Sequence, residues 1–212
     1  MVAKQRIPTK SAGSPVRGLT LAELVIVLAI LAVVGTLVLP AIGRHVAATR
    51  EDVTRQSLVR LRDVIGGMYW DDMASLPEPG VAGLDAGRQA HPQVRYLFVN
   101  PLNVTESTLP DYDPAYRRGW RGPYVTHQGG TFPMPDANFS DYYGEEADPA
   151  VLDGWGNPIV IQNPGWTVGG ARDVRLVSAG PNGVLNIPLA KATVALTETD
   201  QGDDVWLAFE VR

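Results

Sequence analysis

Paired carboxylates are the groups in this sequence with the clearest capacity for chemistry. The best candidate pairs are Asp71-Asp72, Glu145-Glu146 and Asp203-Asp204. Two carboxylates can act as general acid and base, but neighbouring residues of a strand point to opposite faces. No nucleophile stands at a catalytic spacing from any of the pairs. The sequence therefore argues against an enzyme.

Cysteine and histidine add no further candidate. The chain contains no cysteine, which excludes disulfides, thiolate zinc sites and a cysteine nucleophile. The histidines, His45, His91 and His127, are far apart and belong to no ligand or triad spacing. We expect them to be surface or structural residues.

Charge is divided unevenly along the chain. The formal net charge is -5, and residues 1–18 hold four cations and no acid. Subtracting these four leaves -9 on the rest of the chain. Phosphate binding needs clustered Lys and Arg, and no such cluster follows residue 18. Nucleic acid is therefore not expected as a partner.

An apolar run follows the basic segment. Residues 24–39 read LVIVLAILAVVGTLVL, and the flanking Leu19, Leu21, Ala41 and Ile42 extend the run. Its length approaches the roughly 20 residues that a bilayer-crossing helix needs. No small-residue cleavage site ends the run, as one would in a secretory signal. The sequence predicts a membrane anchor over residues 19–43.

Glu23 is the ionisable residue at the start of this run. A carboxylate in a membrane helix is costly and usually has a functional partner. It could also be an interfacial residue, favoured by the dipole at the helix N-terminus and hydrated by the headgroup region. Residue type and position alone leave both readings open.

A fixed pattern surrounds Glu23 and reads RGLTLAEL over residues 17–24. It resembles the processing site of type IV pilins and type II secretion pseudopilins. In that family a short basic leader is followed by Gly, a large apolar residue, Thr or Ser, and Glu as the fifth mature residue. Gly18, Leu19 and Glu23 match these places, although the family usually has Phe at the position of Leu19. Pro40 falls where the family also has a proline.

The resemblance implies a role for each matched residue. A prepilin peptidase would remove residues 1–18 by cutting after Gly18, and the new amine of Leu19 would be methylated. Glu23 would pair with the N-terminal amine of a neighbouring subunit, and Pro40 would kink or locally melt the helix. The leader cations favour a cytoplasmic N-terminus. The chain is then a single-pass inner-membrane protein with residues 44–212 in the periplasm.

The periodicity beyond the anchor predicts that the helix continues. Apolar residues recur at steps of three, four or seven, so the helix should run to about residue 75 and end before Pro77. Gly66-Gly67 is a weak point inside it. Residues 76–153 form a variable loop region with short elements. Its aromatic segment, 112–143, could be a partner surface, but more often such residues pin loops together.

Short strands are predicted in the C-terminal part. The candidates are residues 158–162, 174–178, 192–197 and 205–211, which are separated by Gly, Pro and Asn turns. They predict an antiparallel sheet within residues 154–212. Together with the helix, and following the resemblance, the expected fold is α+β and pilin-like, with a long N-terminal helix packed on a small antiparallel sheet.

A second resemblance lies in this C-terminal part. Residues 153–159 read DGWGNPI, residues 176–183 read LVSAGPNG, and an acidic pair follows at Asp203 and Asp204. They resemble the corresponding segments of the major pseudopilin, whose loop binds calcium. Calcium prefers six to eight oxygen ligands. The resemblance implies that Ala179 (through its carbonyl), Asn182, Asp203 and Asp204 would hold the ion.

Two departures weaken the implied calcium site. Asn182 stands where the family has an aspartate, and residues 184–199 are a long insertion. The alternative is that Asn182-Gly183 forms a tight turn and that the aspartates are solvated.

The two resemblances together imply a structural subunit of a type II secretion pseudopilus. A minor pseudopilin and a type IV pilin subunit stay as alternatives, because they would share residues 17–40. A membrane-tethered binding module that uses the aromatic segment is the alternative from another class. The partners implied are prepilin peptidase, copies of the chain itself, other pseudopilins and the inner-membrane assembly platform.

Overall fold

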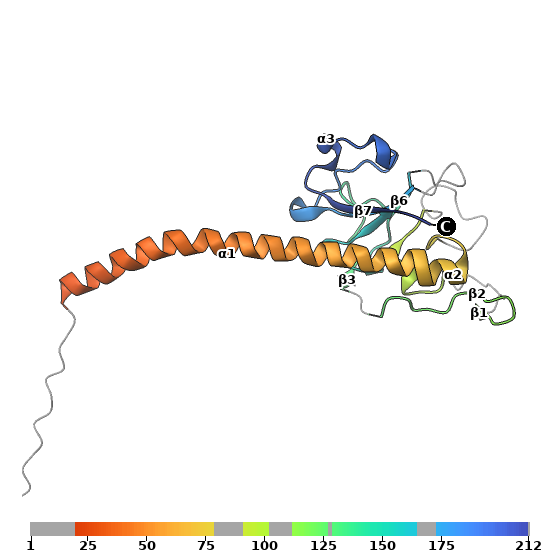
Figure 1. The fold of residues 1–212 in the computed structure, drawn as a ribbon, viewed down its shortest axis with the longest axis horizontal. Helices are drawn as coiled ribbons and strands as arrows, with labels where there is room; N and C mark the ends of the chain where they lie inside the picture. The colour runs from red at the N-terminus through yellow and green to blue at the C-terminus, as the bar shows by residue number, and fades with distance from the viewer. Residues whose placement is uncertain (1–19, 79–90, 102–111, 127–128, 165–172, 212) are drawn as a thin grey trace, which may run out of the picture. The chain divides into compact units, whose positions relative to one another are not determined.

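The computed structural model describes residues 20–78, 91–101, 112–126, 129–164 and 173–211. The chain divides into two compact units, Met1–His45 and Val46–Arg212. The described residues contain helices and small antiparallel sheets, so the predicted α+β class is confirmed (Figure 1).

The described part of the first unit is helical. Helix α1 begins at Leu21, passes through Pro40 without a break and ends at Asp63 in the second unit. Within the described residues, no helix combines the length and apolar character that crossing a membrane requires. Residues 1–19, and the side chains at 35 and 37–44, lie outside the description. The anchor over 19–43 stays a prediction.

The helical run of the second unit ends where the sequence indicates. After α1, the π-helical turn η1 covers Val64–Tyr69 and the short helix α2 covers Trp70–Met73. Ala74 closes the run with a left-handed φ of 53°. The predicted end before Pro77 is confirmed. Gly66 and Gly67 lie inside η1, where the hydrogen-bond ladder widens.

One face of this helical run is buried. Its buried positions step by three or four residues, which is the spacing of one helix face, and they are Thr54, Leu58, Leu61, Ile65, Tyr69 and Asp72. The apolar members belong to a core cluster that also contains Ile161, Val174 and Leu176. The helix therefore packs on a sheet through these side chains.

The sheet has the predicted antiparallel form. Strands β5 (Val160–Gln162), β6 (Asp173–Ser178) and β7 (Val205–Glu210) pair in the order β5-β6-β7. The registers set Ile161 opposite Leu176 and Leu176 opposite Leu207. The strands expected within 158–162, 174–178 and 205–211 are therefore confirmed, with small differences at their ends.

The other face of the sheet is covered by a second core cluster. Successive strand residues alternate between faces, so Val160 and Val177 point away from the helix. They pack with Phe132, Phe139 and Ile187, which come from the middle region and from the insertion. The sheet is thus buried on both sides.

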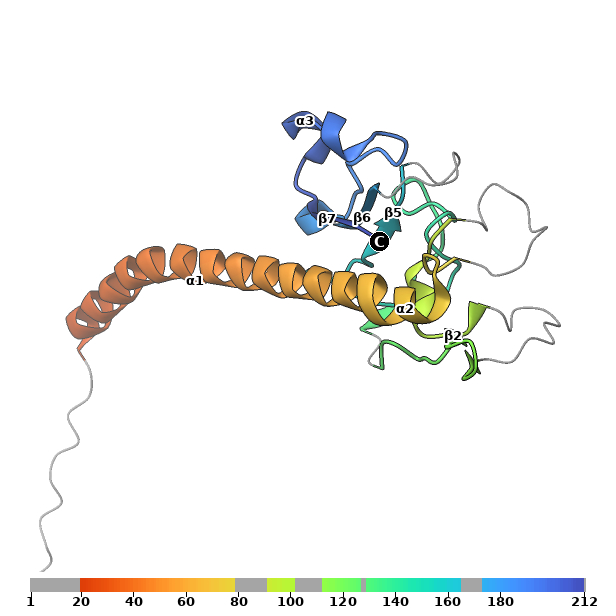
Figure 2. The same cartoon turned by 45° about the vertical axis from the view of Figure 1, so that its right-hand side comes forward.

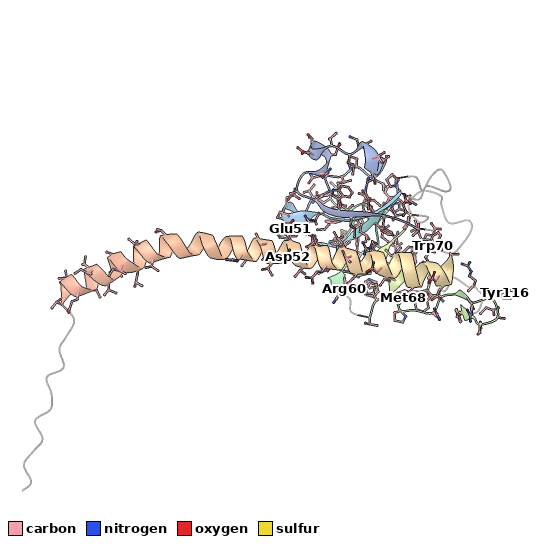
Figure 3. All side chains as sticks on the ribbon, in the orientation of Figure 1. Glu51, Asp52, Arg60, Met68, Trp70 and Tyr116 are labelled. Carbon is pink, nitrogen blue, oxygen red and sulfur yellow. The ribbon has the colours of Figure 1, made fainter. Side chains whose placement is uncertain are left out.

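The described part of the middle region contains only short elements, in line with the prediction. They are η2 (Val94–Leu97), β1 (Tyr112–Asp113), β2 (Arg118–Gly119), β3 (Gly130–Thr131) and β4 (Pro149–Ala150). Strand β1 pairs with β2, and β3 pairs with β4. Most aromatic residues of 112–143 pack into the two clusters, while Tyr116 is exposed (Figure 3). The expectation that these residues pin loops is confirmed for the packed ones.

The strand predicted over residues 192–197 is wrong. That segment forms the single 3-10 turn η6 (Thr193–Ala195), and the short helix α3 (Glu198–Gln201) follows. Thr197 and Asp200 form a capping box that starts α3, and Val194 is 97% exposed. The alternating residue types predict a strand. The segment instead forms helical turns, because the capping box starts α3 and no described strand pairs with residues 192–197. Figure 2 shows α3 in a lobe beside the sheet.

Candidate functional site

The start of α1 positions the Glu23 carboxylate. Thr20 precedes the helix, and its hydroxyl accepts a hydrogen bond from the Glu23 backbone N–H at 3.2 Å. Glu23 Oε2 in turn accepts from the Thr20 N–H at 2.9 Å and from the Thr20 hydroxyl at 2.8 Å. This is a capping box, which satisfies two backbone donors reciprocally. Glu23 is therefore held at the first turn by its own chain.

The sequence analysis did not predict that Thr20 binds Glu23. The spacing Thr-x-x-Glu before an apolar run is a readable sign of a capping box. Gly18 and Leu19 lie outside the described residues, as does the side chain of Pro40. Their predicted roles in cutting, methylation and kinking stay predictions.

The turn over residues 153–157 connects the C-terminal motifs. Asp153 Oδ1 accepts from the N–H groups of Trp155 and Asn157, both at 2.8 Å. Its other oxygen, Oδ2, accepts from the Ser178 hydroxyl at 2.6 Å, and Asn157 Nδ2 donates to the Gly180 carbonyl at 2.8 Å. The two segments that carry the second resemblance therefore bind one another.

The predicted calcium ligands are only partly brought together. Asn182 donates to the Asp203 carboxylate through its backbone N–H at 3.0 Å and through its side-chain amide. In the orientation that satisfies its neighbours, the Asn186 amide also donates to Asp203 Oδ1, at 3.1 Å. Asn186 is a second residue that sequence reasoning missed. The Asp203 carboxylate is thus surrounded by amide donors.

Asp204 accepts hydrogen bonds from the backbone of the insertion. Its Oδ2 accepts from the N–H groups of Asn186 and Ile187, both at 2.9 Å. Burial raises the pKa of this carboxyl to about 6, against the opposing effect of those two hydrogen bonds. Among the described residues, no three acidic or histidine side chains converge as metal ligands. Calcium at Ala179, Asn182, Asp203 and Asp204 stays a prediction.

No family model, curated protein or solved structure matches this chain. The family resemblance consequently depends on the motifs at residues 17–24, at Pro40 and in the C-terminal part.

One member of each of the other two candidate pairs, Asp72 and Glu145, makes a structural contact. Asp72 is nearly fully buried and accepts two hydrogen bonds from Arg121, at 2.6 and 3.0 Å. Tyr124 donates to the same carboxylate at 3.0 Å. Glu145 lies 3.7 Å from Arg95, whose guanidinium also binds Asp148. These ion pairs hold loops to the body.

A groove with a volume of about 560 Å³ runs beside the helix. It is lined by Arg60 and Asp63 from the helix, and by apolar residues that include Val125 and Leu152. Figure 3 labels Arg60, which points outward from the helix.

Proposed function

We propose that this chain is a structural subunit of a type II secretion pseudopilus. Prepilin peptidase cuts it after Gly18, residues 19–43 anchor it in the inner membrane, and residues 44–212 lie in the periplasm. The observation that carries the proposal is the placement of Glu23. Its carboxylate is held at the first turn of a helix whose following apolar side chains are exposed.

The exposed apolar surface of α1 supports an assembly role. Ile26, Leu31 and Val33 are 59%, 60% and 62% exposed, although each is a large hydrophobic residue. A continuous apolar surface of this kind is unfavourable in water and requires a cover. A bilayer supplies that cover before assembly, and the helices of other copies supply it in a filament.

A carboxylate beside this surface then needs a positive partner. In an environment without water, an isolated ionised group is costly, whereas a carboxylate and an ammonium offset each other. The N-terminal amine of Leu19 in a neighbouring copy has the required charge. Such a pair fixes the axial position of each incoming subunit, because only one offset between helices joins the two groups.

The test replaces Glu23 and Gly18 in cells. We expect Glu23→Ala to be cut normally but to form no filaments and to support no secretion. We expect Gly18→Val to remain uncut, because the Val side chain obstructs the peptidase. Cutting is measured by N-terminal mass spectrometry, and assembly by shearing filaments from cells.

Glu51 provides the matched control for Glu23. It is another acid of α1, and it pairs with Arg55 at a partly exposed position (Figure 3). Glu51→Ala should be cut and assembled like the original chain. The proposed register role is refuted if Glu23→Ala assembles as well as Glu51→Ala does. A chain cut elsewhere than after Gly18 would contradict the processing role.

A further inference from the structure

A buried cation of the sheet contacts the insertion over residues 184–199. Arg175 lies in the central strand β6 and is 0% exposed. It shares its face of the sheet with Val177, so its side chain lies on the side opposite the helix. A fully buried arginine is rare, because its charge must be compensated by hydrogen bonds.

The guanidinium of Arg175 has an acceptor for each of its donors. Arginine carries five N–H donors in a rigid planar arrangement. Among the described residues, the Nε group donates to Gln162 Oε1 at 2.8 Å. Nη1 donates to the Lys191 carbonyl at 2.8 Å and to Thr193 Oγ1 at 3.4 Å, and Nη2 donates to the Pro188 and Leu189 carbonyls at 2.7 and 3.5 Å. Four of these five acceptors belong to the insertion.

Gln162 connects the guanidinium to the rest of the core. Its amide nitrogen donates to the Tyr143 hydroxyl at 2.9 Å and to the Ile187 carbonyl at 3.1 Å. These bonds fix the amide so that its oxygen faces Arg175. The network therefore joins β5, β6, the middle region and the beginning of the insertion.

Backbone carbonyls that point at one position resemble the lining of a cation site. Here the Pro188, Leu189 and Lys191 carbonyls surround a positive group that belongs to the chain itself. Removing the guanidinium would take away the donor that these carbonyls share, which lowers the free energy that holds these residues against β6. A free ion can be removed by a chelator, but Arg175 cannot.

We propose that Arg175 is the built-in cation that closes residues 187–199 onto the sheet, so that this closure requires no metal ion. The residues concerned differ from the predicted calcium ligands at 179, 182, 203 and 204. The inference does not rest on the proposed function, because it concerns the folding of the insertion alone.

Hydrogen exchange of the full chain in detergent micelles tests the proposal. We compare the original chain with Arg175→Met, once with calcium and once with the chelator EGTA. In Arg175→Met, amides of residues 187–199 should exchange at least about tenfold faster, because the local opening free energy falls. In the original chain, exchange of this segment should be the same with calcium and with EGTA.

Two further variants complete the experiment. Arg175→Lys keeps the charge but has fewer donors and no planar fork, so we expect an intermediate rate confined to residues 187–199. Arg55→Met removes an exposed arginine that pairs only at the helix surface, and should leave the segment unchanged.

Three results would overturn the proposal. The first is exchange at the original rate in both Arg175 variants. The second is a response of the original chain to EGTA as large as the effect of Arg175→Met. The third concerns Arg175→Lys, and it decides the matter if Arg175→Met unfolds the whole second unit. Faster exchange of Arg175→Lys that is spread evenly over this unit, and not confined to residues 187–199, would contradict a local closure.

Discussion

At the scale of single residues, Asp72 shows how the fold uses a buried carboxylate. Its side chain is 4% exposed, whereas that of its partner Arg121 is 56% exposed. Arg121 also lies over the Tyr112 ring, with its guanidinium carbon 5.0 Å from the ring centroid. The pair therefore fastens the 112–124 segment to the end of the helical run. Water can therefore hydrate the Arg121 guanidinium if Asp72 is removed, but it cannot reach the Asp72 carboxylate as easily if Arg121 is removed.

This difference predicts unequal effects of two substitutions. Arg121→Met leaves a buried carboxylate with Tyr124 as its donor, and should lower the free energy of unfolding by about 3 kcal/mol. Asp72→Asn leaves the exposed guanidinium to water and should cost about 1 kcal/mol. Urea unfolding of the full chain in micelles measures both. Equal losses, or a larger loss in Asp72→Asn, would show that burial of the carboxylate does not set the cost.

At the scale of elements, the turn over residues 153–157 depends on close contact with α1. The Gly154 N–H donates to the Thr54 hydroxyl at 2.9 Å, and that hydroxyl donates to the Arg50 carbonyl at 2.8 Å. A Cβ at Gly154 would lie 2.3 Å from the Arg50 carbonyl oxygen. No side chain fits there unless the turn moves away from the helix.

Gly154→Ala should therefore destabilise the chain by about 1–3 kcal/mol, since backbone atoms must shift to admit the methyl group. Gly67→Ala is the matched control, because a Cβ there has nothing within 4 Å. It lies within a helical turn, so it should be neutral or stabilising by up to about 1 kcal/mol. Thermal unfolding midpoints of the two variants should move in opposite directions or differ clearly. A similar midpoint for both would contradict the close contact.

The elements also show what the sequence could predict. Strands β6 and β7 follow from their β-branched and aromatic residues, and the helix end follows from Pro77, because these signals are local. Arg175 lies between Val174 and Leu176, so alternation alone predicts that it faces water. The insertion covers Arg175 instead. The hydrogen bonds from Arg175 to the Pro188 and Lys191 carbonyls join residues that are 13 and 16 positions apart, so no local sequence pattern predicts them. Thr20 and Glu23, by contrast, carry a capping signature that is readable directly.

At the scale of the whole molecule, His91 couples stability of the second unit to pH. It is fully buried beside the rings of Tyr142 and Tyr143, with centroid distances of 6.3 and 5.6 Å. Nδ1 lies 3.0 Å from the Pro92 carbonyl. Burial lowers the pKa of His91 from 6.5 to about 4, against the opposing effect of hydrogen bonds to the backbone. The folded chain consequently keeps this imidazole neutral at pH values where the unfolded chain protonates it.

The direction of the pH effect follows from proton binding. Between pH 6.5 and about 4 the unfolded state binds the extra proton, so stability falls as the solution is acidified. The total loss should be about 3 kcal/mol. His91→Gln keeps a polar side chain without titration, and all other titrating groups are common to both chains. The free energy of unfolding of the original chain minus that of His91→Gln should therefore decline by about 3 kcal/mol from pH 7 to pH 4, as measured by urea unfolding. Parallel pH curves for the two chains would show that His91 titrates normally in the folded state.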